Sequence, residues 1–423
     1  MCYLRNLQGD MALTSASIVP KGLDKFAITA CALTFAGGVL ASAFIPVLAA
    51  ILTVLSIVFG LIALPNSVDS LRRSGRAFKI FLASGGLLTL LMAGNILARR
   101  SSDKGYEMLL HFALLVPLIL ALNRYLSGVK IPAWRALFTL SAVQMMIMIP
   151  ASFIQVYYLE VGRAHGAINA NVFAHLLGAH SGLISVWLFL TTLKRPSWGA
   201  NLRLLAWQIL AISTLFLTGT RGVIIAFAPL IVGFIVIDIW QRRKVAWQPL
   251  LFSVVALSYL MALVFVSDRF ALSAAELNLA LAEGQNVGSI GRRLGIWAES
   301  WRLIKENPLL GHGYFAFSDI ISPELTSLQL HPHAHNQILN YWLMLGMAGP
   351  VFILWFMGQA MVVGLKQFLD KMAPEAGLAL VWLSGGFFVF GLTDIFMAHT
   401  NAAVYLTVVF GVFYLQAGLQ VRR

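Results

Sequence analysis

Long apolar runs separated by short polar turns recur along the chain from Phe26 to Leu419. Each run is close to the ~20 residues that an α-helix needs to cross the hydrocarbon core of a bilayer. A helix also makes its backbone hydrogen bonds within the segment, as a lipid environment requires. The pattern predicts an all-α polytopic membrane protein with about twelve transmembrane helices. The runs are centred within residues 26–45, 47–64, 78–97, 107–123, 137–157, 172–192, 203–220, 222–239, 247–266, 335–363, 376–397 and 402–419.

One long polar segment, residues 267–334, interrupts this pattern. It divides the chain into an N-terminal transmembrane region of about nine spans (1–266), the loop itself (267–334) and a C-terminal transmembrane region of about three spans (335–423). The loop is too short and too apolar for an independent domain. We therefore expect it to fold onto the membrane region.

Two short amphipathic helices are predicted within this loop. Ser273 and Glu276 have the spacing of a capping box, which would open a first helix that Gly284 ends. A second helix is expected from Arg292 to Asn307, before Pro308. Its apolar stripe consists of residues spaced by three and four positions, namely Leu294, Trp297, Trp301 and Ile304.

The second loop helix carries two adjacent arginines, Arg292 and Arg293. On a helical wheel Arg293 lies at the edge of the apolar stripe and Arg292 lies nearly opposite it. Arg293 is therefore better placed to contact the membrane region and a lipid-linked anion there. An ordinary amphipathic helix with two solvated arginines would have the same sequence, so both interpretations stay open.

The composition is typical of a membrane protein, and this changes how the positive net charge is interpreted. Charged residues make up 11% of the chain and hydrophobic residues 59%, whereas soluble proteins are about 25% charged. The formal net charge of +13 would suggest nucleic-acid binding in a soluble protein. With a cytoplasmic N-terminus, however, most Lys and Arg residues fall on inner segments, as the positive-inside rule requires. We expect membrane lipids and no nucleic acid as partners, and the 267–334 loop on the outer side.

A polar stretch that runs directly into an apolar helix, His331 to Gly349, is the main candidate for chemistry. Charging a histidine at the mouth of a membrane segment costs desolvation free energy, and the neutral ring can accept a proton near neutral pH. His335 is therefore a candidate general base. The alternative is an interfacial histidine that is merely solvated.

Two arginines on outer turns are candidates for anion binding. Arg221 lies between two apolar runs in Thr218-Gly219-Thr220-Arg221-Gly222, at the outer surface and against the positive-inside trend. An arginine held there can bind a phosphate through two hydrogen bonds. Arg163 lies in an outer turn with aromatic and acidic neighbours. Snorkelling arginines in an aromatic belt are the alternative for both.

Asp394 lies near the outer end of the eleventh predicted span. An ionised acid within a span costs free energy unless it is paired. We therefore expect Asp394 to pair with Arg221, Arg293 or His335. We expect no metal and no cofactor, because arginines without a carboxylate pair indicate an anionic group neutralised by guanidinium. A zinc site of His331, His333 and His335 is geometrically possible, but the sequence shows no nearby acid or cysteine to complete it.

Several of these motifs together resemble bacterial O-antigen ligases. The pattern begins with His335-Asn336 and continues with Gly346 and Gly349 directly after the longest polar loop. Thr218 to Gly222 is similar to a Ser/Thr-Arg element of that family, and Arg293 with Trp297 resembles its loop arginine. Asn307 to Gly313, which contains His312, resembles the Asn-Pro-x-x-Gly-x-Gly element of the same superfamily.

The resemblance implies a glycosyltransferase of the bacterial inner membrane with a periplasmic active site. It would move O-antigen polysaccharide from undecaprenyl pyrophosphate to a sugar of lipid A–core, without a metal and with inversion. His335 would be the base, and Arg221 and Arg293 would bind the pyrophosphate, with Arg163, Arg292 and Asn336 as further substrate contacts and Asp394 and His312 in support.

Three alternatives remain open. An O-antigen polymerase would use the same donor with a second lipid-linked glycan as acceptor. A protein O-oligosaccharyltransferase of the superfamily usually carries a larger domain after its last span. A transporter would bind a translocating anion with its intramembrane Arg, His and Asp, but transporters commonly show internal repeats, and the long loop occurs only once.

Overall fold

The computed structural model describes most of the chain and is helical throughout its described parts. The residues described are 20–42, 44–67, 75–99, 104–243, 246–283, 288–313, 333–396 and 400–420. His331, Gly284 and the stretch 314–332 of the predicted loop lie outside these residues. No strand occurs within them, so the all-α prediction is confirmed for this part of the chain.

The helices follow one another with short connections. Their bounds are α1 Lys21–Ala41, α2 Pro46–Ala63, η1 Pro65–Ser67, α4 Arg76–Arg99, α5 Lys104–Gly128, α6 Ala133–Phe153, η2 Ile154–Tyr158, α7 Ala170–Lys194, α8 Trp198–Thr218, α9 Arg221–Arg242, α10 Trp247–Val266, α11 Asp268–Glu283, α12 Gly288–Glu306, α14 Gln337–Leu345, α15 Ala348–Leu369, α16 Pro374–Gly391 and α17 Thr400–Gln420. Of the short elements, η1 is a 3-10 turn, and η2 is a π-helical turn that extends α6.

Within the described residues, eight helices are long and apolar enough to cross a membrane, namely α1, α6 with η2, α7, α8, α9, α10, α15 and α16. Four shorter apolar helices lie where the other four spans were predicted, at Val47–Ala63, Phe78–Leu90, Leu115–Gly128 and Ala403–Leu415. The multi-pass helical architecture is therefore present. The full count of twelve spans stays a prediction.

The predicted continuous span over residues 335–363 is wrong, because the chain breaks at Gly346. Gly346 has φ +63°, a left-handed conformation that glycine adopts without strain, and a side chain there would meet the backbone of Leu309. The break leaves a short helix, α14, ahead of the span-length α15. Since α14 packs against α12, the segment after His335 is joined to the loop as much as to the membrane region.

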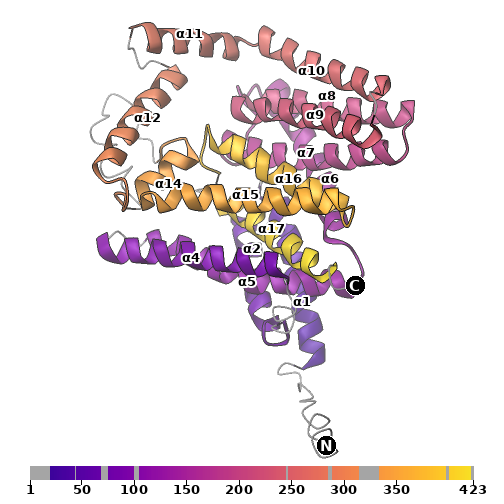
Figure 1. The fold of residues 1–423 in the computed structure, drawn as a ribbon, viewed down its shortest axis with the longest axis vertical. Coiled ribbons are helices and arrows are strands. Elements are labelled where there is room, and N and C mark those ends of the chain that lie inside the picture. Colours follow the sequence, from indigo (N-terminus) through magenta and orange to yellow (C-terminus); the bar gives the residue numbers. More distant parts are fainter. Residues whose placement is uncertain are drawn as a thin grey trace, which may run out of the picture.

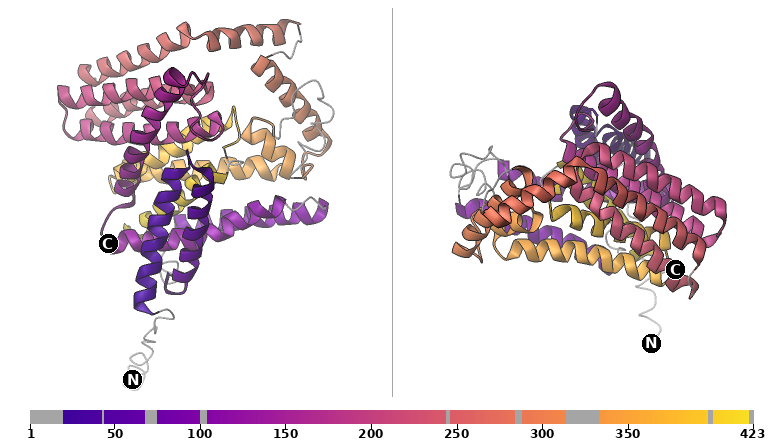
Figure 2. Two further views of the ribbon diagram at one scale, coloured as in Figure 1. Left: turned by 180° about the vertical axis from the view of Figure 1, so that it is seen from behind. Right: turned by 90° about the horizontal axis from the view of Figure 1, so that it is seen from above.

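Helices α7 to α10, α15 and α16 run side by side, and α11 and α12 lie at one end of them (Figure 1). Helix α7 is the central one, because 78% of the residues in its 18-residue apolar stretch are buried inside the protein. Its neighbours include α6, α8, α9 and α16. The start of α9, the end of α16 and the loop before α7 come to the same end as α11 and α12, and the second set of views shows the same arrangement (Figure 2).

The loop helices form at the expected places, but two local predictions about them are wrong. Ser273 does not cap α11, which already begins at Asp268; its hydroxyl donates to the Arg269 carbonyl one turn earlier, at 2.6 Å. Glu276 instead reaches the next helix. Trp301 was placed in the buried stripe of α12, yet it is 43% exposed, and Ile296 takes a buried place in that cluster.

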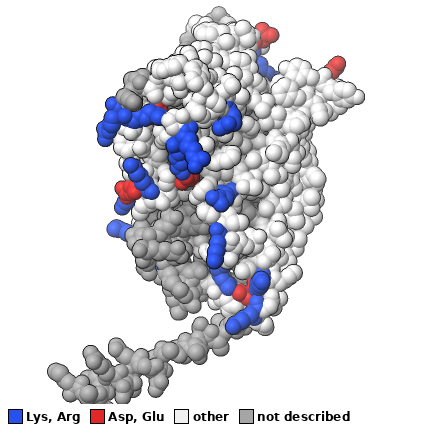
Figure 3. All heavy atoms as spheres, turned by 90° about the vertical axis from the view of Figure 1, so that its right-hand side faces the viewer, with Lys and Arg blue, Asp and Glu red and all other residues white. Residues whose placement is uncertain are grey.

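Basic side chains gather at the opposite end of the molecule (Figure 3). Lys194, Arg242 and Lys366 close the last turns of α7, α9 and α15 there. A cation in the last turn interacts favourably with the helix dipole. The same distribution is typical of the cytoplasmic side of a membrane protein.

Candidate functional site

His335 is held in an unusual backbone conformation at the start of α14. Its φ is +48°, in the left-handed region that histidine visits only rarely. The Trp297 indole donates to the carbonyl of Ala334 at 2.9 Å, and the Ala334 amide donates to the side chain of Asn340 at 3.2 Å. Ala334 is fully buried between α12 and α14. The neighbouring packing therefore fixes the position of the His335 ring.

Asn336 acts as the N-cap of α14. Its side-chain oxygen accepts from the amides of Ile338 and Leu339 at 3.0 and 3.1 Å, and its amide nitrogen donates to the carbonyl of Leu392 at 3.1 Å. Such a cap stabilises a helix by about 1 kcal/mol. The bond to Leu392 also joins the start of α14 to the end of α16. A substrate contact of Asn336 remains a prediction; its visible role is to connect His335 to the loop that carries Asp394.

Asp394 lies beside His335, with 3.5 Å between Oδ1 of the acid and Nδ1 of the imidazole. The Asp394 side chain is 4% exposed. Burial acts to raise the pKa of its carboxyl, but the hydrogen bond with His335 and the charges of His175 and His333 outweigh it and hold the pKa below its usual value. Asp394 is thus a carboxylate at neutral pH, as a partner that orients a histidine base must be.

Two further histidines complete this cluster. The amide of His335 donates to Nδ1 of His333 at 3.4 Å, and the two rings meet edge to face with centroids 4.3 Å apart. His175 comes from α7, is buried and stacks on Phe390 at 5.3 Å. His175 could not be singled out from the sequence, because a single histidine in an apolar helix is more often a structural residue.

His333, His335 and Asp394 each offer one ligand atom within 4.8 Å of the others. The sequence shows no acid near the histidines, whereas in the fold Asp394 supplies one from the distant end of α16. The spacing of the three groups would suit a metal ion.

Arg163 extends from the turn between η2 and α7 to the junction of α8 and α9. Its guanidinium donates to the carbonyl of Thr218 at 2.7 Å, and to the side chains of Asn171 and Thr220 at 3.0 Å each. Burial lowers its pKa, and so do the charges of Arg269, Arg221 and Arg293, in that order. The charges of three other arginines therefore act on Arg163.

Arg221 is the first residue of α9 and reaches toward the loop helices. Its guanidinium donates to the carbonyl of Arg269 at 3.3 Å and to the hydroxyl of Ser289 at 2.5 Å. Ser289 lies 3.4 Å from Glu276, whose carboxylate also accepts from the amide of Ile290 at 2.9 Å. Glu276 thus caps the start of α12 and holds the partner of Arg221, a role that the capping-box interpretation missed.

Arg293 and Arg292 differ as the helical wheel predicted. Burial lowers the pKa of the Arg293 guanidinium, while the charges of Asp394 and Glu276 act in the opposite direction, so Arg293 lies near both acids. Arg292 donates to the carbonyl of Gly288 in its own helix at 2.9 Å. Of the two, Arg293 belongs to the arginine cluster.

Arg269 is the cluster member that the sequence did not single out. Its guanidinium lies over the turn at Gly219, where a Cβ would come within 2.9 Å of a guanidinium nitrogen. Its side chain has no hydrogen-bond acceptor or ion-pair partner among the described residues. Gly219 has φ +63° and ends α8, so the glycine serves both the turn and this close approach.

His312 lies apart from this cluster. Its Nε2 atom is 2.7 Å from the carbonyl of Leu303 at the end of α12, and its amide donates to the carbonyl of Leu343 in α14 at 2.6 Å. Gly311 adopts φ +68° beside it. These contacts join α12 to α14, and the supporting role of His312 at the site stays a prediction.

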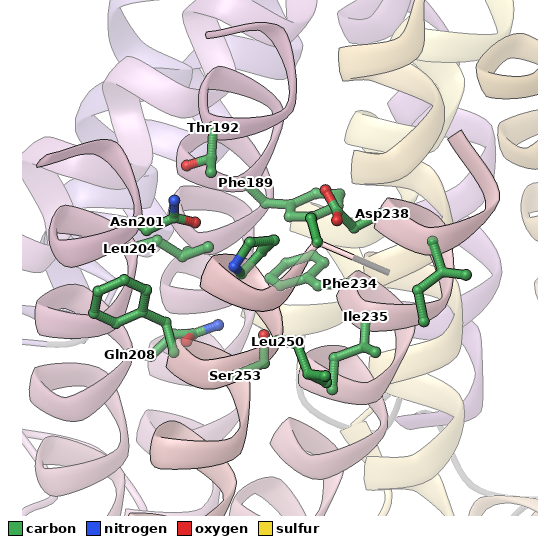
Figure 4. Close-up of a pocket in the computed structure, with 14 residues that line it drawn as sticks. Phe189, Thr192, Asn201, Leu204, Gln208, Phe234, Ile235, Asp238, Leu250 and Ser253 are labelled. Atoms are coloured by element: carbon green, nitrogen blue, oxygen red, sulfur yellow. The ribbon is translucent and has the colours of Figure 1, made fainter. Parts of the chain in front are cut away.

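A polar pocket elsewhere is too small to serve as a substrate site (Figure 4). It measures about 10 Å³ and is lined by Thr192, Asn201, Gln208 and Asp238 among others. Asp238 lies about 25 Å along α9 from Arg221, given a rise of 1.5 Å per residue, and pairs with Arg242 at 2.7 Å. The pocket belongs to the packing of the opposite end.

The described geometry assembles a histidine–carboxylate pair and a cluster of four arginines, Arg163, Arg221, Arg269 and Arg293. Residues 206–355 match a family model described as O-antigen ligase. The matched segment runs from α8 into α15 and contains His335 and three of the four arginines. A comparison with curated proteins found no match to the chain.

Proposed function

We propose that the protein is a glycosyltransferase of the membrane, starting from the membership of residues 206–355 in the O-antigen ligase family. Its donor would be O-antigen polysaccharide on undecaprenyl pyrophosphate, and its acceptor a sugar of lipid A–core. The observation that carries the proposal is the position of the His335–Asp394 pair beside the four-arginine cluster at one end of the membrane helices.

The arginine cluster supports an anionic donor. Arg163 is repelled by the charges of Arg269, Arg221 and Arg293, and Arg221 is repelled by those of Arg293 and Arg269. The two acids nearby, Asp394 and Glu276, offset part of this repulsion. A bound pyrophosphate would relieve the repulsion and accept hydrogen bonds from the planar guanidinium groups. The N-terminus of α9, where Arg221 lies, adds a favourable dipole.

His335 would act as general base in a single displacement. Its ring takes the proton of the acceptor hydroxyl while that oxygen attacks the anomeric carbon and the bond to the pyrophosphate breaks. The electron pair of the broken bond stays on the pyrophosphate, where the arginines stabilise it. Attack opposite the leaving group inverts the anomeric centre. Asp394 orients the imidazole and stabilises its protonated form.

The same charges argue against a metal at the histidine cluster. A cation bound by His333, His335 and Asp394 would lie close to Arg293, whose charge already interacts with Asp394. Repulsion between like charges at such range is substantial in a partly buried site. The proposed reaction therefore uses guanidinium groups in place of a divalent ion.

The proposed location is the bacterial inner membrane with the site facing the periplasm. The basic residues at the far ends of α7, α9 and α15 favour a cytoplasmic position for that end. A periplasmic reporter fused after Glu283 should then be active, and a cytoplasmic reporter at the same point inactive. The reverse result would place the site on the wrong side for this donor.

Deletion of the gene tests the function and separates it from its closest alternative. For a ligase, the lipopolysaccharide of the deletion strain should lose its whole O-antigen ladder while lipid-linked polymer accumulates. A single repeat left on the core would indicate a polymerase. An unchanged ladder would contradict both the ligase and the polymerase, and the transporter interpretation would then have to be tested.

A further inference from the structure

An apolar groove of about 360 Å³ runs along the outside of α9 and α16, and residues from α7 and α15 also line it. Its floor includes Trp382, and Met361 of α15 lies on one side. Pro229 and Gly233 of α9 line its other side, and Pro229 is exposed. No charged residue lines the groove, so its chemistry is that of a hydrocarbon-binding surface.

The groove begins close to the arginine cluster and leads away from it. Its first residue on α9, Ala226, lies about 8 Å beyond Arg221, and its last, Ile237, about 24 Å beyond, at 1.5 Å per residue. On the antiparallel helix α16 the groove ends at Val389, a few residues before Asp394. Gly222 and Thr393 lie against each other where the two helices meet. The groove thus extends from beside the proposed anion site through much of the ~30 Å hydrocarbon core.

Gly233 explains why space exists at this place. A Cβ built on Gly233 would have no atom within 4 Å, so the missing side chain leaves the groove open. Gly385 of α16 contributes in the same way, since only the end of Met361 approaches it, at 3.2 Å. Larger residues at these two positions would fill the groove.

From these observations we propose that the groove binds the polyprenyl chain of the donor, with the pyrophosphate at the arginine cluster. This inference rests on the proposed function and adds to it the path of the lipid. One molecule has to place a charged group at the arginines and a long hydrocarbon chain in the bilayer. The groove is the apolar surface that begins where the arginines end. Its open side also allows a lipid to enter sideways from the membrane.

The test substitutes Gly233→Phe, which places a ring at a groove-lining position where a Cβ has no atom within 4 Å. Transfer is measured with one glycan on two donors, a long polyprenyl pyrophosphate and a citronellyl pyrophosphate too short to extend along the groove. Loss of burial for about two methylene groups should reduce kcat/KM for the long donor about tenfold. The short donor should be used as well as by the wild type.

Gly358→Phe is the matched control. Gly358 lies in α15, is exposed and also has no atom within 4 Å of a built Cβ, but it does not line the groove. This variant should treat both donors as the wild type does. Equal rates of Gly233→Phe and the wild type with the long donor would overturn the groove assignment while leaving the proposed function intact. A wild type that transfers from neither donor would instead contradict the proposed function.

Photocrosslinking identifies the occupant directly. A diazirine-bearing polyprenyl pyrophosphate should label α9 and α16, and unlabelled polyprenyl pyrophosphate should compete with it. Labelling by a diazirine-bearing phospholipid that polyprenyl pyrophosphate does not displace would show an ordinary membrane lipid in the groove. That outcome, or labelling confined to other helices, would overturn the inference.

Discussion

The imidazole of His335 lies 3.5 Å from the carboxylate of Asp394, across the junction between the start of α14 and the end of α16. The segments that carry the two residues are joined by a second contact, in which the side-chain amide of Asn336 donates to the carbonyl of Leu392. The acid and the base are therefore positioned by the same contact between two helices. Their roles can be separated by experiment.

Asp394→Asn should lower turnover at least about tenfold, though less than loss of the base itself, which costs ~10²- to 10⁴-fold. The pKa of the Asp394 carboxyl is held below its usual value, so the wild-type charge is present at neutral pH. That charge stabilises the imidazolium that forms as the acceptor hydroxyl loses its proton. Without it, turnover should fall while the KM for donor stays near the wild-type value. Asp370→Asn, at an exposed position at the opposite end of α15, serves as the control, and wild-type turnover in Asp394→Asn would contradict the pairing.

His335→Asn should abolish most transfer, by ~10²- to 10⁴-fold, because the general base is removed. Asparagine tolerates the positive φ of this position better than alanine does. His335→Asn should therefore unfold at a higher temperature than His335→Ala, although both are inactive. Donor binding should persist in both variants. Normal lipopolysaccharide ladders from either one, at matched protein levels, would remove His335 from the mechanism.

Arg221→Lys and Arg269→Lys should each raise the KM for donor, since lysine keeps the charge but loses the planar group that grips two phosphate oxygens. Loss of one charge-assisted hydrogen bond should cost about 10-fold in donor affinity. Arg302→Lys, on the exposed face of α12 beside Glu299, should behave as the wild type. If the Arg269 variant matched this control, Arg269 would lie outside the donor site.

Gly222→Ala should reduce activity because a Cβ at this position would lie 2.1 Å from the hydroxyl of Thr393, next to Asp394. The loop that carries the acid would have to move. The double variant Gly222→Ala with Thr393→Ala removes the obstructing hydroxyl and should recover most of the loss. A measured coupling of about 1 kcal/mol or more would support this explanation, whereas additive effects would place the damage elsewhere.

Transfer by the purified protein should survive EDTA, because the arginine cluster supplies the positive charge that a cation would otherwise supply. The assay compares chelated and untreated protein with the same donor. Loss of activity on chelation, restored by one particular metal, would contradict the proposal. It would also identify His333, His335 and Asp394 as the ligands to test.

The sequence by itself determined the class of the protein and the main candidates for its chemistry. An apolar run of ~20 residues is long enough for a helix to cross the hydrocarbon core, and a helix makes its backbone hydrogen bonds within the segment, so the length and hydrophobicity of the runs located nearly all of the span-length helices. Helical geometry also separated Arg293 from Arg292, and in the structure the charges of Asp394 and Glu276 act on Arg293. The resemblance to O-antigen ligases likewise rests on motifs that can be read in the sequence.

Only the tertiary structure decided which distant residues meet. The pairing of His335 with Asp394, the positions of Arg269 and His175, and the use of Glu276 as a cap on α12 all depend on contacts between helices far apart in sequence. The break at Gly346 was hidden because apolar residues continue through it, and the reason for the turn is the close approach of Leu309. Hydrophobicity determines that a segment is buried, whereas the partners of its polar groups are set by how the helices pack.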